Sequence, residues 1–450
     1  MRRVFQHPDR NVRCARLQLL AWYNLAMRFI ADLHIHSRYS RATSRDMSPE
    51  TLWRWGQLKG ITVLGTGDFT HPLWHRELLE KLEPAGNGLY RLKRLFAADN
   101  IPDSCRADIF FLPTAEISCI YKKSGRTRKV HILLLARTLD DAYRINIELA
   151  KIGNLSADGR PILGLDVKDL LHIVLTTAPD ALFVPAHIWT PHFSVFGSAS
   201  GFDSLEECFE ELTPHIHAVE TGLSSDPPMN WRIAGLDRLT LISNSDCHSA
   251  SKIGREATVF DADISYDAIM TAIRTKRGYA GTIEFFPEEG KYHVDGHRAC
   301  SVSLSPKETI RHNYLCPVCG RAVTVGVMHR VEKLADRDEG FRPKTAAPSR
   351  SLVPLQELIA EALDAGAATK KVRAAYFDLL EKCGNELSIL TDVPLRDVRS
   401  AVAEPKIAEA IDLMRRGQVH IAPGYDGEYG KVRIFEKVAP PRKKGQEVLF

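Results

Sequence analysis

Histidines and carboxylates follow several short apolar segments of this sequence. Asp32-Leu33-His34-Ile35-His36 places two imidazoles two residues apart, on one side of an extended segment, where both can reach one metal ion. A single His-x-His pair is a weak signal, and further donors after other apolar segments give it weight. The candidate metal ligands are His34, His36, Asp68, Glu116, His131, His187, Asp246 and His248. Imidazoles combined with carboxylates suit zinc, manganese or iron better than calcium.

Each of these residues also has an ordinary explanation when it is taken alone. His131 could be a hydrogen-bonded core histidine, Glu116 a helix cap or a surface charge, and Asp246 the holder of a turn. Taken together they indicate one site, because several polar side chains would otherwise face one end of a sheet without partners. Divalent ions held there would generate hydroxide from water and clamp phosphate oxygens. The set therefore predicts phosphoester hydrolysis, with Asp246, Glu116 and His187 as the catalytic residues.

The elements that must position these residues alternate between short apolar runs and longer helix-like stretches. Strands are expected at Arg28–Leu33, Thr62–Thr66, Ile109–Ile117, His131–Ala136, Ala181–Ala186, Ala218–Glu220 and Leu239–Ser243, and helices at Pro49–Lys59 and Tyr266–Thr275. Such alternation predicts a parallel α/β sheet and, at this length, a barrel of the TIM type. The carboxyl ends of its strands would form the reactive face, where one strand ends at Glu220.

A second metal site is predicted further along the chain. His297-Arg298-Ala299-Cys300 and Cys316-Pro317-Val318-Cys319-Gly320 carry two ligand pairs that can meet around one structural zinc ion. The expected ligands are His297, Cys300, Cys316 and Cys319, with His293 and His312 as substitutes for His297. The alternative is a set of thiols without a metal. Gly326–Val331 follows and is expected either to line a base pocket or to form an ordinary strand.

The length of 450 residues leaves room for several domains. We expect an N-terminal extension at 1–26, disordered or an artefact of upstream translation, a metal-dependent phosphoesterase barrel at 27–287, a small zinc-binding module at 288–346 and a mostly helical domain with a short terminal strand at 347–450. No apolar run approaches the roughly 18 residues that span a membrane, so no membrane partner is expected. Nine cysteines without a secretory signal indicate reduced thiols and a cytoplasmic protein.

The net charge of +4 decides little, but two basic stretches stand out, at 122–129 and 442–444. They suit a nucleic-acid backbone, or they are a solvated loop and a disordered tail.

The order HxH, D, E, H, H, DxH over residues 28–285 resembles the polymerase-and-histidinol-phosphatase (PHP) domain family. The resemblance implies a distorted β/α barrel with a trinuclear metal centre. It implies one metal on His34, His36, Glu116 and Asp246, a second on Glu116, His131 and His187, and a third to which His248 contributes. Two departures concern the third metal: the usual Asp-His pair is Asp68-Phe69, and Ser40-Arg41-Ala42 stands where another histidine is expected. His71 or Asp46 could compensate.

Residues 28–436 as a whole resemble the endonuclease Q family. The motifs that carry the resemblance include DLHIHSRYSRATS, GTGDFTHP, PTAEIS, PAHIWTP, SNSDCHS, LCPVCGRAVTVGVMHRVEKLADR and PGYDGEYGKVRIF. The resemblance implies a DNA repair endonuclease that cleaves 5′ to deaminated bases (hypoxanthine, uracil, xanthine) and abasic sites, leaving a 3′-hydroxyl and a 5′-phosphate. Damaged DNA is the implied partner. Zn²⁺ is the expected structural and catalytic metal, with Mg²⁺ or Mn²⁺ as alternatives at the catalytic centre.

Recognition of a deaminated base has a physical basis, because such a base pairs poorly and is easier to unstack. We expect it to flip into a pocket between the barrel and the zinc module, where backbone amides favour its carbonyl oxygen. Candidate substrate contacts are Trp189, Phe193 and Arg330, although Trp189, Phe193 and Phe196 could instead be core aromatics. Two other functions stay open, a small-molecule phosphatase of the histidinol-phosphate kind and a non-catalytic DNA-binding protein. The zinc module and helical tail count against the first, and the nearly complete ligand set against the second.

Overall fold

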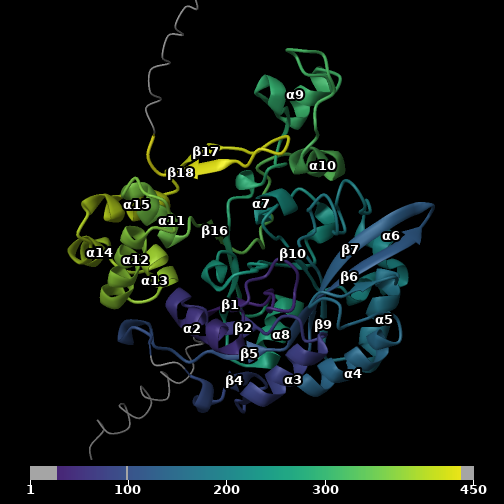
Figure 1. Cartoon of the computed structure of the whole chain (residues 1–450). Helices are drawn as coiled ribbons and strands as arrows, with labels where there is room; N and C mark the ends of the chain where they lie inside the picture. The colour runs from purple at the N-terminus through teal and green to yellow at the C-terminus, as the bar shows by residue number, and fades with distance from the viewer. Residues whose placement is uncertain (1–27, 98–99, 437–450) are drawn as a thin grey trace, which may run out of the picture.

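The computed structural model describes residues 28–97 and 100–436 (Figure 1). The extension expected at 1–26 and the basic stretch at 442–444 lie outside these residues. The described chain has a mixed α/β fold, in which strands near the centre carry helices on their outer side. None of the helices in the described ranges combines the length and the apolar character that crossing a membrane requires. The domain boundaries expected from the sequence stay a prediction.

The largest sheet contains the N-terminal strands. Its order is β16 (Ser349–Ser351), β13 (Tyr279–Glu284), β12 (Ala257–Asp261), β1 (Arg28–Asp32), β2 (Val63–Gly65), β5 (Phe110–Leu112), β4 (Tyr90–Leu92) and β3 (Leu82–Pro84). A second sheet has the order β8 (Ile162–Leu163), β6 (Thr114–Lys123), β7 (Arg126–Leu135) and β9 (Leu182–Pro185). A parallel pair joins β10 (Ala218–Glu220) to β11 (Thr240–Ile242).

The TIM-type barrel expected from the sequence is not present as one closed sheet among the described residues. The strand ladders are split between separate sheets, β12 runs antiparallel to β1, and β7 runs antiparallel to both β6 and β9. The reason lies in the hairpin formed by β6 and β7, which replaces a strand–helix–strand unit. Ser124 and Gly125 both have positive φ, as a tight two-residue hairpin turn requires. The basic stretch at 122–129 is the tip of this hairpin and not a loop.

Helices cover the outer side of the sheets, and their caps explain their bounds. They are α2 (Pro49–Lys59), α3 (Pro72–Lys81), α4 (Leu139–Ala150), α5 (Val167–Thr177), α6 (Leu205–Phe209), α7 (Pro227–Asn230) and α8 (Tyr266–Thr275). α2 begins after Ser48, whose hydroxyl accepts the Thr51 N–H, and ends at Gly60 in the left-handed conformation. The predicted bounds of α2 and α8 are confirmed.

A smaller part of the chain lies between β13 and β16 in the sequence and projects from the body in Figure 1. It contains β14 (Asp295–His297), β15 (Val302–Leu304), α9 (Pro306–Arg311) and α10 (Val327–Leu334). The strand considered for Gly326–Val331 is wrong, because this segment opens helix α10. Gly326 is its N-cap and donates its N–H to the buried carboxylate of Asp295 at 2.7 Å, while Val327 and Val331 are buried on one helix face.

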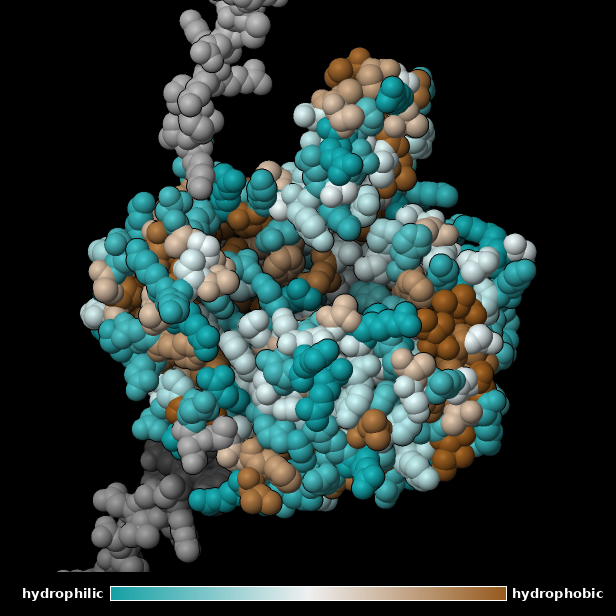
Figure 2. All heavy atoms as spheres, in the orientation of Figure 1, coloured by the Kyte–Doolittle hydropathy of each residue, from teal (hydrophilic) through white to brown (hydrophobic). Residues whose placement is uncertain are grey.

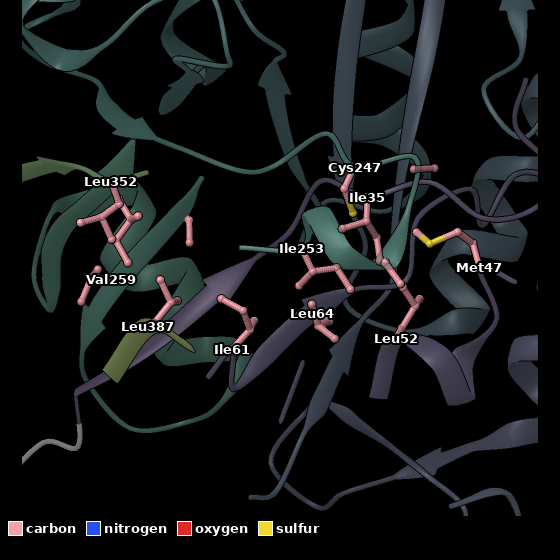
Figure 3. Close-up of a cluster of buried hydrophobic side chains, with 14 of the residues drawn as sticks. Ile35, Met47, Leu52, Ile61, Leu64, Cys247, Ile253, Val259, Leu352 and Leu387 are labelled. Atoms are coloured by element: carbon pink, nitrogen blue, oxygen red, sulfur yellow. The ribbon is translucent and has the colours of Figure 1, made fainter. Parts of the chain in front are cut away.

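The described C-terminal part, up to residue 436, is mostly helical, as the sequence predicts for the region that begins at residue 347. It contains α11 (Leu355–Ala362), α12 (Lys370–Cys383), α13 (Glu386–Thr391), α14 (Leu395–Ala401), α15 (Pro405–Arg415), and the hairpin strands β17 (His420–Ala422) and β18 (Lys431–Arg433). Figure 3 shows how it joins the sheets, since Leu352 and Leu387 lie in the same apolar cluster as Ile61 and Leu64. A buried ion pair between Lys59 Nζ and Glu386 Oε2, 2.6 Å apart, adds a polar link.

Candidate functional site

Two extended segments after β1 and β11 lie side by side and alternate between core and polar residues. Ile35 pairs with Cys247, and the N–H of His36 donates to the carbonyl oxygen of Cys247 at 3.1 Å. Figure 3 shows Ile35 and Cys247 together within the apolar cluster. Because side chains alternate along an extended chain, the neighbours of these two residues face the other way. His34, His36 and Asp246 are thereby brought to one place.

Glu116, on β6, stands between two groups of donors. His34, His36, Glu116 and Asp246 form one group and Glu116, His131 and His187 the other, each with its ligand atoms within 4.8 Å of one another. Glu116 Oε2 lies 3.3 Å from His36 Nε2, whereas Glu116 Oε1 lies 2.6 Å from His131 Nδ1 and 2.9 Å from His187 Nε2. Each carboxylate oxygen thus faces a different group. With cations bound, Glu116 would contribute one oxygen to each donor group.

His248 and Asp68, unlike the other expected ligands, lie outside both donor groups. The ring of His248 lies 4.4 Å from that of His36, but its Nδ1 is 3.0 Å from the carbonyl oxygen of Asp246, and it belongs to neither group. Asp68 also lies outside the groups: its Oδ1 is 3.0 Å from His36 Nδ1, and its Oδ2 accepts from the N–H of Ser37. The carboxylate of Asp68 thus lies behind His36 and outside both donor groups, and direct metal binding by Asp68 stays a prediction.

The residues suggested as compensating ligands of a third metal do not join a donor group either. His71 stacks on Tyr39 with ring centroids 4.3 Å apart, and Asp46 is exposed. Phe69 is buried in the apolar core, and the hydroxyl of Ser40 donates to Asp68. Among the described residues, the donors therefore form two clusters at this centre and not three.

Glu220 orients the site from behind His34, a role that its sequence position does not reveal. Both of its oxygens lie 3.0 Å from His34 Nδ1, and they also accept from the N–H of His187 and the side-chain amide of Asn244. A carboxylate on one ring nitrogen fixes the tautomer and turns the other nitrogen toward the centre. Asp68 does the same for His36. The only sequence signal for Glu220 was its place at a strand end.

The backbone at the site is held in an unusual conformation. Asp68, His187 and Asp246 have φ of 46°, 30° and 45°, in the left-handed region that non-glycine residues rarely adopt. Gly222 packs against His187 so closely that a Cβ there would lie 2.3 Å from the His187 Cβ. Such strain is retained where the surrounding structure over-determines it, and it is common at functional sites.

The electrostatics of the centre favour bound cations. Nε2 of His34 is buried without a hydrogen-bond partner, 3.6 Å from Glu116 Oε2 and 3.7 Å from Asp246 Oδ1. Burial opposes protonation of His34, but Glu220, Glu116 and Asp246 outweigh it and raise its pKa well above the usual value. Burial lowers the pKa of His131 to about 4, so this imidazole stays neutral and can ligate. An unpartnered imidazole nitrogen facing two carboxylates fits a metal ligand set.

The cysteine-rich segment also converges. His297, Cys300, Cys316 and Cys319 have their ligand atoms within 4.8 Å of one another, with Cys319 Sγ 3.6 Å from His297 Nδ1. The N–H of Gly320 donates to the carbonyl oxygen of Cys316, and Gly320 has φ of 71°, which makes the tight turn possible. The suggested substitutes His293 and His312 are not in this cluster. Four such donors fit a structural zinc site.

The three candidate substrate contacts have different environments. Trp189 is buried, with its indole N–H donated to Asn230 at 2.8 Å, and Phe196 packs beside it in the core. Arg330 is 9% exposed and donates to the carbonyl oxygens of Phe196 and Phe202 and to Asp203. Two of the three candidates, Trp189 and Arg330, therefore stabilise the fold through buried hydrogen bonds. Phe193 is only half-buried, and its ring lies 4.6 Å from that of His131.

Parts of the chain match known sequence families and curated proteins. A model described as MJ0043 C-terminal domain matches residues 354–418, and one described as PHP-associated matches residues 231–277. An uncharacterized Methanocaldococcus jannaschii protein, MJ0043, is 33% identical over 252 residues, which are 54% of this chain and 31% of that protein. The match thus spans about a third of that relative. An uncharacterized Bacillus subtilis protein, YqxK, is 29% identical over 90% of this chain and 98% of its own.

Solved structures match nearly the whole chain. The lesion-specific endonuclease PfuEndoQ from Pyrococcus furiosus is 30% identical, with a TM-score of 0.79 over 90% of this chain and 95% of its own. An endonuclease Q complex with a 27-mer duplex that has an abasic lesion at the active site is also 30% identical, with a TM-score of 0.76 over 91% of this chain and 97% of its own. Agreement in sequence and structure over this length shows that the chain belongs to the endonuclease Q family.

Proposed function

We propose that this protein is a metal-dependent endonuclease that nicks duplex DNA 5′ to deaminated bases or abasic sites. The observation that carries the proposal is the position of Glu116, whose two oxygens face separate histidine groups. Two-metal sites are a common basis for phosphodiester hydrolysis, because they stabilise both the attacking and the leaving oxygen. The solved endonuclease Q complex, which holds a duplex with an abasic lesion at its active site, supports DNA as the substrate here.

Some side chains of the centre would hold the cations, and others orient the side chains that hold them. Divalent cations, when bound, would lower the pKa of a water molecule and neutralise charge on the scissile phosphate. Glu116 directs one oxygen to each histidine group and thereby sets the separation of the groups. Glu220 and Asp68 contact Nδ1 of His34 and His36 and fix the orientation of these two rings. Cys247, beside the centre, is unsuited to act as a nucleophile, because burial raises the pKa of its thiol to about 12 and keeps it protonated.

Phe193 is the aromatic best placed to contact a displaced base. Its carbonyl oxygen accepts the N–H of His131 at 3.0 Å, so its backbone is tied to a residue of the centre. Lys129 Nζ lies 5.3 Å from the centre of its ring, which places a cation beside the aromatic face. Aromatic rings of this kind stack on bases, and lysines contact phosphates. We assign Phe193 to the support of the damaged nucleotide.

The cysteine cluster and the parts around it would complete a DNA-binding surface. We propose that His297, Cys300, Cys316 and Cys319 hold a structural zinc ion that keeps the projecting segment folded. Figure 2 shows the molecular face hollowed between this projecting segment, the helical part and the sheet body. A duplex placed there would touch all three parts, which a small phosphomonoester would not need.

A nicking assay with defined lesions tests the proposal. Duplexes that carry one uracil, hypoxanthine, xanthine or abasic site are incubated with the protein and Mg²⁺, Mn²⁺ or Zn²⁺, beside an undamaged duplex. We expect one nick 5′ to the lesion, with a 3′-hydroxyl and a 5′-phosphate, and none on undamaged DNA or with Glu116→Gln. Hydrolysis of phosphomonoesters alone would indicate a phosphatase. Binding of the lesion without cleavage in every metal would indicate a non-catalytic protein.

A further inference from the structure

Arg160, which the sequence analysis did not single out, reaches the metal centre from a loop. Its Nη1 donates to Glu116 Oε2 at 2.9 Å, and its side chain is 27% exposed. In the described part of the chain, this is the one side-chain hydrogen bond that the guanidinium makes. A guanidinium carries five N–H donors in a fixed planar fork. Most of the donors of Arg160 are therefore available to a ligand at the mouth of the centre.

The loop that carries Arg160 is pinned against the centre by specific contacts. The N–H of Gly159 donates to the carbonyl oxygen of Tyr39, and the hydroxyl of Thr70 donates to the carbonyl oxygen of Gly159. A Cβ on Gly159 would lie 2.3 Å from Asp68 Oδ2, so only glycine permits this approach. Asp158 accepts the N–H of Arg160 at 3.1 Å. The position of Arg160 is thus set by its backbone.

Two other partly or fully buried arginines show what a structural arginine looks like in this fold. Arg330 donates to two carbonyl oxygens and to Asp203, and Arg128 donates to the carbonyl oxygen of Gly201 and to Glu207. Both span neighbouring segments with several of their donors, and both are at most 9% exposed. Arg160 instead points its charge at a carboxylate of the donor groups and remains partly open. This difference indicates that Arg160 binds a ligand and does not serve to join neighbouring segments of the fold.

We propose that Arg160 binds a non-bridging oxygen of the scissile phosphate, an inference that rests on the proposed function. In the cleavage, the water oxygen forms a bond to phosphorus while the bond from phosphorus to the upstream O3′ breaks. One water proton ends on O3′, the other passes to solvent, and Arg160 keeps its own protons throughout. The guanidinium stabilises the negative charge on the phosphoryl oxygens as that bond exchange proceeds. The hydroxyl of Ser40 donates to Asp68 on this side of the centre, and Arg160 brings a positive charge there that contacts Glu116 directly.

Substitution of Arg160 combined with sulfur substitution of the DNA tests the contact. Arg160→Gln should lower kcat by about 10²- to 10³-fold, as loss of one transition-state donor does, and Arg160→Lys should recover part of it. Duplexes with a single Rp or Sp phosphorothioate at the scissile position then give the sulfur penalty for each diastereomer. We expect the penalty of one diastereomer to shrink in Arg160→Gln, because the contact that sulfur weakens is already absent. An unchanged penalty for both diastereomers would overturn the proposal.

Metal content and phosphate binding distinguish phosphate binding by Arg160 from a role in which Arg160 only holds Glu116 in place. Elemental analysis should find the same metal content in Arg160→Gln as in the wild type. Calorimetry with inorganic phosphate should show binding that is weaker by about tenfold or more, since a charge-assisted hydrogen bond is lost. If Arg160→Gln loses metal and excess metal restores its activity, the proposal is contradicted. Arg144→Gln, on the exposed side of α4, is the matched control and should match the wild type throughout.

The failure of this inference can be told from failure of the proposed function. If the wild type does not nick lesion DNA, the proposed function fails, whatever Arg160 does. If the wild type nicks and Arg160→Gln nicks at the same rate, only the assignment of Arg160 is wrong.

Discussion

Both carboxylate oxygens of Glu220 lie 3.0 Å from Nδ1 of His34, on the side of the ring opposite the candidate metal centre. The contact leaves Nε2 of His34 buried and aimed at Glu116 and Asp246. Glu220 comes from β10 and His34 from the segment after β1, so the pair links two separate sheets. The metal affinity of the centre should therefore depend on a residue that does not touch the metal.

Glu220→Gln should weaken metal binding by about 10- to 100-fold, because the amide no longer fixes the His34 tautomer with a charge. Nicking at low metal concentration should fall and should recover as metal is added. The measurement is a metal titration of the nicking rate. Glu83→Gln, on the exposed edge strand β3, is the control and should follow the wild-type curve. Loss of activity that no metal concentration restores would mean that Glu220 acts in another way.

Cys316→Ser should remove the zinc ion of the cysteine cluster and loosen the segment that carries α9. Serine is a poor zinc ligand, and metal binding would supply much of the folding energy of this small part. Elemental analysis of the purified variant should show zinc loss, and limited proteolysis should cut within residues 298–325. Cys383→Ser, which changes a cysteine outside the cluster, should keep its zinc. Wild-type zinc content in Cys316→Ser would argue against the site.

Glu284→Gln should change how stability depends on pH. Burial raises the pKa of Glu284 from 4.5 to about 8, so the folded protein keeps a proton that the unfolded chain releases between these values. The free energy of unfolding should therefore fall as pH rises through this window, by at most about 1.4 kcal/mol per pH unit from this group. The glutamine oxygen can still accept from Thr221 and Ser243. Urea unfolding from pH 5 to about 8 should show a flatter profile for the variant, and equal slopes would refute this.

Glu386→Gln should detach the helical part more easily from the sheet body. Lys59 Nζ and Glu386 Oε2 are 2.6 Å apart and almost fully buried, so the substitution leaves a buried ammonium without a counter-charge. The cost should be about 3–5 kcal/mol. Asp378→Asn, in an exposed pair with Lys382, should cost less than about 1 kcal/mol. Denaturant unfolding of both variants gives the comparison, and a similar small change in each would contradict the role of the buried pair.

The local pattern of the sequence was sufficient to locate most of the donor residues. Alternation around Ile35 and Cys247 places His34, His36 and Asp246 on one side, and strand ends supply the others. What the pattern could not resolve is which carboxylate binds and which supports. Asp68 and Glu220 both follow strands, as Asp246 does, and only the three-dimensional contacts separate them.

The other features that the sequence does not predict also have local causes. The β6–β7 hairpin was hidden because its tip is charged and its turn, Ser124-Gly125, is short. Helix α10 was hidden because it is only about two turns long and begins at Gly326 without a side-chain cap. Arg160 lies in a loop, where no periodicity marks a functional residue. Its position depends on contacts with Tyr39 and Thr70, which are distant in the sequence.

Anomalous X-ray scattering from crystals grown with Mn²⁺ or Zn²⁺ tests the central claim most directly. We expect two peaks on either side of Glu116, one among His34, His36 and Asp246 and one beside His131 and His187. A map with no peak within bonding distance of Glu116, from crystals that show full zinc density in the cysteine cluster, would contradict the account.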